Sequence, residues 1–108
     1  MPRQINKTLG ILDFEWDPGK EIKNIEKHEI NFTEAMYTFS DTHSLTLFDE
    51  GHSKNEDRWI TIGRIPSSKL LVVVYTNRGT QDKEIIRIIS ARKAKKKEEK
   101  EYFEGRSR

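Results

Sequence analysis

The sequence predicts an α+β domain with a mostly antiparallel sheet of four to five strands, two N-terminal helices and one C-terminal helix. Two observations carry this prediction. Three apolar runs rich in Val, Ile and Leu lie within residues 59–92, separated by two turn-rich breaks. Such residues fit the packed surface of a sheet. In front of these runs, two short segments with apolar residues at helical spacing each follow a residue that caps helices well.

Five segments are expected as strands: 13–17, 44–49, 59–64, 70–79 and 85–92. In the first, Phe14 and Trp16 alternate with acidic residues and should be buried. Hairpins near residues 67 and 80 would place Arg87 opposite Val73, and Val73 opposite Ile62. Because opposite side chains share a face, Arg64 and Arg87 would then lie on one side of the sheet.

The first helix is expected over residues 18–28. Asp17 is a good N-cap, and Pro18 suits the first helical position because its missing N–H costs nothing there. The thin apolar stripe of this helix should bury Ile22 and Ile25.

A second helix over 34–40 would begin at the cap Thr33 and bury Ala35, Met36 and Phe39. The third helix is expected over 92–104, where Gly105 ends it.

Composition bounds the function. The 108 residues suit a single domain, 1–108, with the first twelve as a flexible arm. The chain has no cysteine, and His28, His43 and His52 lack metal-ligand spacing, so neither a metal nor a cofactor is expected. No apolar run suggests a signal peptide or a membrane span, so a cytoplasmic protein without membrane contact is expected. Residues 92–108 carry eight Lys/Arg against four Glu, which favours an anionic partner such as nucleic acid.

Five arginines lie within or at the ends of the predicted strands: Arg58, Arg64, Arg78, Arg87 and Arg92. Arginine can bind two phosphate oxygens at once, a loop carboxylate such as Glu56 can act as a base, and His52 can move protons near neutral pH. These groups could cleave RNA without a metal. Carboxylates near arginines also make ordinary salt bridges, so a structural role stays open. Convergence of the arginines on one open hollow would favour RNA cleavage over the structural role.

A series of sequence words resembles the BrnT toxin family. The words are FEWD at 14–17, KH at 27–28, RW at 58–59, IGR at 62–64, VVYT at 73–76 and RIISAR at 87–92, with Phe32, Glu34, Ala35, Phe39, Asp41 and Arg78 among them. The resemblance implies a RelE-like ribonuclease fold and an RNA-cleaving toxin that inhibits translation. It also implies a BrnA-like ribbon-helix-helix antitoxin that forms a hetero-oligomer with the toxin and alone contacts operator DNA.

The residue roles combine this resemblance with the chemistry above. The expected catalytic residues are Glu56, Arg64, Arg78 and Arg92, and the expected RNA-binding residues are Arg58, Arg87, His52 and Lys93. A non-catalytic protein that binds RNA or modulates the antitoxin would use the same arginines and remains the alternative.

Two features depart from the family pattern. Where the family usually has glycine after Lys27 and His28, this chain has Glu29. A residue other than glycine in the left-handed turn that would end the helix costs roughly 1 kcal/mol, so a rebuilt corner is expected. The first twelve residues carry no role from the resemblance.

Overall fold

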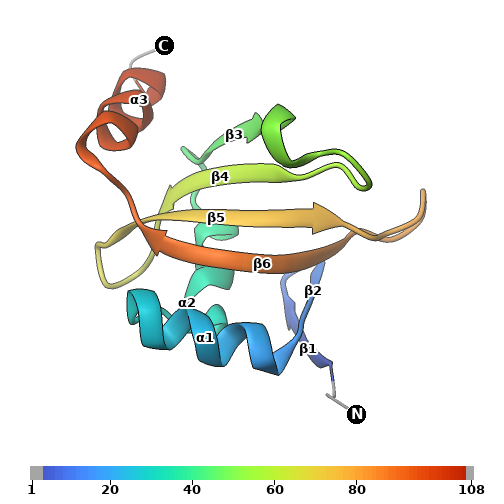
Figure 1. The fold of residues 1–108 in the computed structure, drawn as a ribbon. Coiled ribbons are helices and arrows are strands. Elements are labelled where there is room, and N and C mark those ends of the chain that lie inside the picture. Colours follow the sequence, from blue (N-terminus) through green and yellow to red (C-terminus); the bar gives the residue numbers. More distant parts are fainter. Residues whose placement is uncertain (1–3, 107–108) are drawn as a thin grey trace.

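The computed structural model describes residues 4–106 and has one six-stranded mixed sheet, in the order β1-β2-β6-β5-β4-β3 (Figure 1). The strands are β1 (Ile5–Leu9), β2 (Leu12–Trp16), β3 (Leu45–Phe48), β4 (Trp59–Arg64), β5 (Leu70–Asn77) and β6 (Ile85–Lys93). The helices are α1 (Pro18–His28), α2 (Phe32–Met36) and α3 (Lys96–Arg106). The α+β class is confirmed, and no helix within residues 4–106 is long and apolar enough to cross a bilayer.

The sheet is larger than predicted because residues 5–9, expected in a flexible arm, form β1. Gly10 at φ 62° and Ile11 connect β1 to β2 in a tight hairpin with Leu9 opposite Leu12. Glycine adopts this left-handed conformation without a steric penalty. Residues 1–3 of the predicted arm lie outside the described residues.

The second difference is that β2 pairs parallel to β6 instead of extending an antiparallel meander, with Glu15 opposite Arg87. The predicted register was also wrong: Arg87 lies opposite Thr76, and Val73 lies opposite Thr61 and Ala91. A bulge at Val74/Tyr75 shifts the β5–β6 pairing. Arg64 and Arg87 nevertheless share one face of the sheet, because Leu70, opposite Arg64, and Thr76 are an even number of residues apart.

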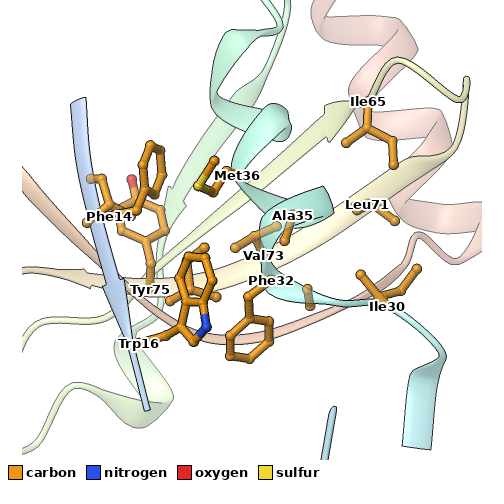
Figure 2. Packing of buried hydrophobic residues seen from close by; sticks show 13 residues of the cluster. Phe14, Trp16, Ile30, Phe32, Ala35, Met36, Ile65, Leu71, Val73 and Tyr75 are labelled. Carbon is orange, nitrogen blue, oxygen red and sulfur yellow. The ribbon is translucent and has the colours of Figure 1, made fainter. Parts of the chain in front are cut away.

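The main core fills the face of the sheet that packs against α2, while α1 runs alongside β6 (Figures 1 and 2). Phe14 and Trp16 are buried there as predicted, and Trp16 packs edge-on against Phe32. On the opposite face, called the open face below, Tyr102 of α3 packs on Ile62 and Val72. Since α3 covers only part of that face, charged side chains of β2 and β6 remain beside it.

Helix α1 begins as predicted, with the Asp17 carboxylate accepting a hydrogen bond from the Gly19 N–H at 2.7 Å. Its packing differs from the prediction. Ile22 and Ile25 are 58% and 42% exposed, whereas Asn24 is buried. The Asn24 amide donates to the carbonyls of Ile30 and Ala91 and accepts from the Ala91 N–H. A polar side chain therefore fixes α1 on the exposed edge of β6, and an apolar stripe is not needed.

The other two helices start at different residues from those predicted. Asn31, not Thr33, caps α2, and the chain tightens into a 3-10 turn over Tyr37–Ser40. Ala35 and Met36 are buried as predicted, and Phe39 packs partly buried against the core. Helix α3 begins late because β6 continues to Lys93.

The corner after α1 is not rebuilt. Glu29 adopts the left-handed conformation at φ 59°, and its N–H donates to the Ile25 carbonyl at 2.8 Å. The chain therefore keeps the turn that glycine would make and carries the steric cost of a side chain there.

Candidate functional site

The loop 49–58 between β3 and β4 holds the first group of predicted site residues. The Asp49 N–H donates to the Arg58 carbonyl, which extends the strand pairing into the loop. The Ser53 hydroxyl donates to the Asp49 carbonyl and accepts from the Arg58 N–H. These bonds tie both ends of the loop together and position its side chains at the end of the sheet.

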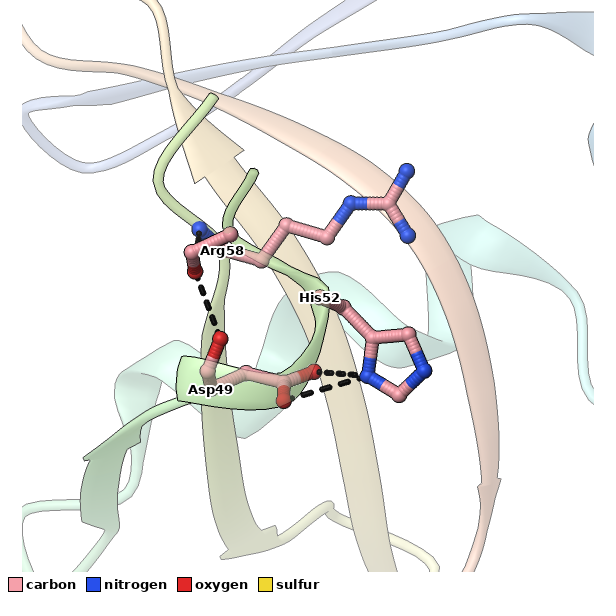
Figure 3. Close-up of polar contacts among 4 residues, drawn as sticks. Asp49, His52 and Arg58 are labelled. Carbon is pink, nitrogen blue, oxygen red and sulfur yellow. Dashed lines mark hydrogen bonds and ion pairs between the residues drawn. The ribbon is translucent and has the colours of Figure 1, made fainter. Parts of the chain in front are cut away.

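His52 is held by Asp49. The imidazole Nδ1 lies 3.0 and 3.1 Å from the two carboxylate oxygens of Asp49, while the His52 side chain is 71% exposed (Figure 3). With Nδ1 protonated, Asp49 accepts its hydrogen bond and orients the ring, so Nε2 faces outward and can exchange a proton with a bound molecule. Asp49 was not among the site residues predicted from the sequence. The signal was its spacing, since residues three apart meet in a single helical turn, here the 3-10 turn Glu50–His52.

An open pocket of about 440 Å³ lies beside His52 and is lined by Gly51, His52, Lys54, Asn55, Glu56 and Arg58. The guanidinium of Arg58 and the ring of His52 extend from the loop in the same direction (Figure 3). Glu56 pairs with Arg78, at the end of β5, with 3.2 Å between Oε2 and the guanidinium, and both side chains are nearly half exposed. We call His52, Glu56, Arg58 and Arg78 the loop cluster.

The loop cluster combines groups that can accept a proton, donate one and bind a phosphate. Glu56 offers a carboxylate, His52 an oriented imidazole, and the two arginines planar donors that match phosphate oxygens. Within residues 4–106, no carboxylate lies within salt-bridge distance of Arg58, so this guanidinium is available to a ligand. No group of three or more His, Cys, Asp or Glu suited to a metal ion occurs in the same residues.

The other two predicted catalytic arginines lie elsewhere. Arg64 ends β4, six residues after Arg58, which corresponds to roughly 20 Å along an extended strand. Its guanidinium lies over the Phe103 ring of α3, 5.6 Å from the centroid, and donates to the Ser68 carbonyl. The predicted catalytic set is therefore divided between the two ends of the sheet.

Arg64 also belongs to a hydrogen-bonded corner around Asp41. The Asp41 carboxylate accepts from the Arg64 N–H at 2.8 Å, from the Tyr102 hydroxyl at 2.6 Å and from the His43 N–H at 2.9 Å. Burial acts to raise the pKa of Asp41, but these hydrogen bonds outweigh it and hold the pKa below its ordinary value. This corner attaches α3 to the sheet.

Arg92 contacts the same helix through two hydrogen bonds of 2.7 Å to the Glu98 carboxylate. The bonds from Arg92 lower the pKa of Glu98 against the effect of burial, and the same pair raises the pKa of Arg92. Arg87 is paired as well, with its guanidinium 2.6 Å from Glu15. Lys93 lies exposed at the end of β6. Three of the five strand arginines thus have a carboxylate partner, which fits the structural role. Arg58, Arg64 and Arg92 line three different pockets, so the expected convergence of the arginines on one hollow is not found among the described residues.

Comparisons with known proteins agree on one family. The family model described as "Ribonuclease toxin, BrnT, of type II toxin-antitoxin system" matches residues 16–98. Among solved structures, the ribonuclease toxin BrnT of Brucella abortus matches with a TM-score of 0.57 and 24% sequence identity, covering 75% of this chain and 94% of that one. At this identity the structural likeness is one of fold. A search of curated protein sequences gave no match.

Proposed function

The chain belongs to the BrnT family of ribonuclease toxins of type II toxin–antitoxin systems, and from this premise we propose that it cleaves RNA at the loop cluster without a metal ion. The observation that carries the proposal is the common direction of Arg58 and the Asp49-bound His52 above an open pocket, with Glu56 at its margin. A phosphate placed there would meet a guanidinium, an imidazole and a carboxylate.

The proposed reaction is an attack by the 2′-hydroxyl on the adjacent phosphorus. Glu56 takes the proton of the 2′-hydroxyl as the O2′–P bond forms, and Arg58 with Arg78 stabilises the extra negative charge on the phosphate. The P–O5′ bond breaks, and the His52 imidazolium gives its Nε2 proton to the leaving 5′-oxygen while Asp49 holds Nδ1. The products are a 2′,3′-cyclic phosphate and a 5′-hydroxyl end, and proton exchange with water resets both side chains.

The cellular role that follows is inhibition of translation through loss of RNA, with neutralisation by a bound antitoxin. The partner expected from the resemblance is BrnA-like, with a ribbon-helix-helix domain that contacts operator DNA for the complex. Covering the loop cluster would be enough to block the reaction, since the side chains assigned to it are exposed or half-exposed.

The test is RNA cleavage by purified protein in the presence of EDTA, with the ends of the products identified. Substitutions His52→Ala, Glu56→Gln and Arg58→Ala should each lower kcat by about 10²- to 10⁴-fold, the range for losing a proton-transfer group or an electrostatic stabiliser. Folding should be retained because these residues lie on the surface. Cleavage that requires an added divalent ion would contradict the metal-free mechanism.

Arg64→Ala is the matched control, because it removes the same guanidinium at the other end of the sheet. We expect it to keep kcat close to that of the unsubstituted protein. If Arg64→Ala abolished cleavage while Arg58→Ala did not, the reaction would have to take place beside α3, and the loop cluster would be excluded.

The second candidate function is binding of RNA, or modulation of the antitoxin, without catalysis. The carboxylate partners of Arg78, Arg87 and Arg92 favour it, because paired arginines stabilise structure and leave fewer groups for chemistry. In that case RNA would bind but stay intact with and without EDTA, and expression without antitoxin would leave total RNA unchanged.

A further inference from the structure

A second concave surface lies between α1 and β6, on the side of the open face. Its pocket of about 450 Å³ is lined by Lys20, Lys23, Asn24, Lys27, His28, Ile89, Ser90 and Arg92. We call it the α1–β6 groove. The function assigned to the loop cluster uses none of these side chains.

The spacing of the α1 residues explains how one helix supplies most of this lining. Positions 20, 23, 24, 27 and 28 follow the three- and four-residue spacing of a helix face, so their side chains lie in one stripe. Asn24, at its centre, is anchored to the backbone of Ala91. These hydrogen bonds fix the position of the lysine stripe along β6.

The groove carries positive charge that nothing in its lining cancels. Arg92 is neutralised by Glu98, which leaves the three lysines, with His28 beside them. The salt bridges of lysines within residues 4–106 involve Lys69, Lys83 and Lys100, none of them in the groove. Glu21, the acidic residue in the first turn of α1, is turned inward, where it accepts hydrogen bonds from Trp16 and the Phe32 N–H.

The groove and the loop cluster lie along one face. Ser90 and Arg92 pair with Val74 and Val72, and Arg87 pairs with Thr76, all on the open face. Arg58 directly precedes Trp59, whose partner is Tyr75, so Arg58 comes level with Thr76. The Arg87 and Arg92 levels are four residues apart along β5, from Thr76 to Val72, because one residue of β6 is taken up by the bulge. This is roughly 13 Å of strand, or about four stacked nucleotides at 3.4 Å each.

We infer that the α1–β6 groove binds the phosphate backbone of the RNA strand whose cleaved bond lies at the loop cluster, with Lys20, Lys23 and Lys27 contacting phosphates about four nucleotides away. The inference rests on the proposed RNA substrate. Lysines suit such a contact because they bind phosphate as point charges without reading the base. The groove would thus favour long RNA over short RNA.

The test compares two triple variants that lose the same charge. One carries Lys20→Gln, Lys23→Gln and Lys27→Gln, and the other carries Lys96→Gln, Lys97→Gln and Lys100→Gln on α3. The probe is a fluorescein-labelled, 2′-O-methylated single strand of about 12 nucleotides, which can bind but cannot be cleaved through its 2′-oxygens. Fluorescence anisotropy then gives the dissociation constant at a series of salt concentrations.

We expect the slope of log K against log salt to fall by about 2 in the α1 variant, because each lost phosphate contact removes about 0.7 for single strands. The α3 variant should change the slope by less than about 0.7, the value for one contact. In cleavage assays the α1 substitutions should raise KM for a long RNA and leave KM for a dinucleotide substrate unchanged.

Equal slopes for the two variants would overturn the inference even if cleavage is intact. Loss of antitoxin binding in the α1 variant with unchanged RNA binding would also overturn it, and would assign the groove to the protein partner. If the two variants show the expected difference in slope but the unsubstituted protein cleaves no RNA, RNA binding by the α1–β6 groove is supported. In that case only the proposed catalytic function is refuted.

Discussion

Arg87 offers the sharpest test of whether a strand arginine stabilises the fold or binds RNA. Its guanidinium lies 2.6 Å from Glu15, and the two side chains are only 22% and 12% exposed. Removing one partner of a buried pair leaves the other charge uncompensated, at a cost of about 3–5 kcal/mol. Because Arg87 keeps some contact with water, we expect Arg87→Met to lower the free energy of unfolding by about 2–3 kcal/mol.

The assay is urea unfolding followed by circular dichroism, with an unchanged m-value as evidence of two-state behaviour. The double variant Glu15→Met with Arg87→Met removes both charges and should recover to within about 1 kcal/mol of the unsubstituted protein. RNA affinity per folded molecule should stay the same. A stability loss below about 0.5 kcal/mol together with weaker RNA binding would refute the structural role and restore the role predicted from the sequence.

Three further outcomes follow from the fold. Glu29→Gly should raise the melting temperature by about 4 °C, since relief of the left-handed side chain is worth about 1–2 kcal/mol and the added chain entropy of glycine takes back part of it. Asn24→Ala should cost about 2–3 kcal/mol in urea unfolding, because it leaves backbone groups of β6 without partners. Asp41 has a lowered pKa in the folded state, so its contribution to stability is fully present above its pKa in the unfolded chain and is lost as the pH falls below about 4. Asp41→Asn should therefore flatten the acid side of a plot of the free energy of unfolding against pH.

The parts of the fold that local chemistry determines were predictable. Asp17 and Pro18 begin α1 as expected, and Phe14 and Trp16 are buried, because capping and alternation depend on neighbouring residues alone. The position of β1 depends on a glycine hairpin that could equally have been a free arm. The parallel pairing of β2 with β6 joins residues far apart in the sequence, which no local pattern indicates.

The candidate site was predictable in its residue types and less so in its grouping. Glu56 and Arg78 meet across two loops, and Arg58 joins them at the pocket side, but Arg64 faces away toward α3. Strand alternation gives the face on which an arginine lies, yet its height along the sheet depends on register. Thr76 pairs with Arg87, so the β5–β6 hairpin turns between residues 81 and 82 and not near residue 80, and residue types alone do not specify that offset.

The pairing of β2 with β6 also determines when the sheet can be completed during synthesis of the chain. Glu15 and Arg87 are 72 residues apart. At a synthesis rate of 5–20 residues per second, roughly 4 to 14 s pass between the synthesis of Glu15 and that of Arg87. Until then, the first hairpin has one unpaired edge and part of the core is open to water. A ribonuclease toxin built this way reaches its finished sheet only after the residues of β6, up to Lys93, have been synthesised.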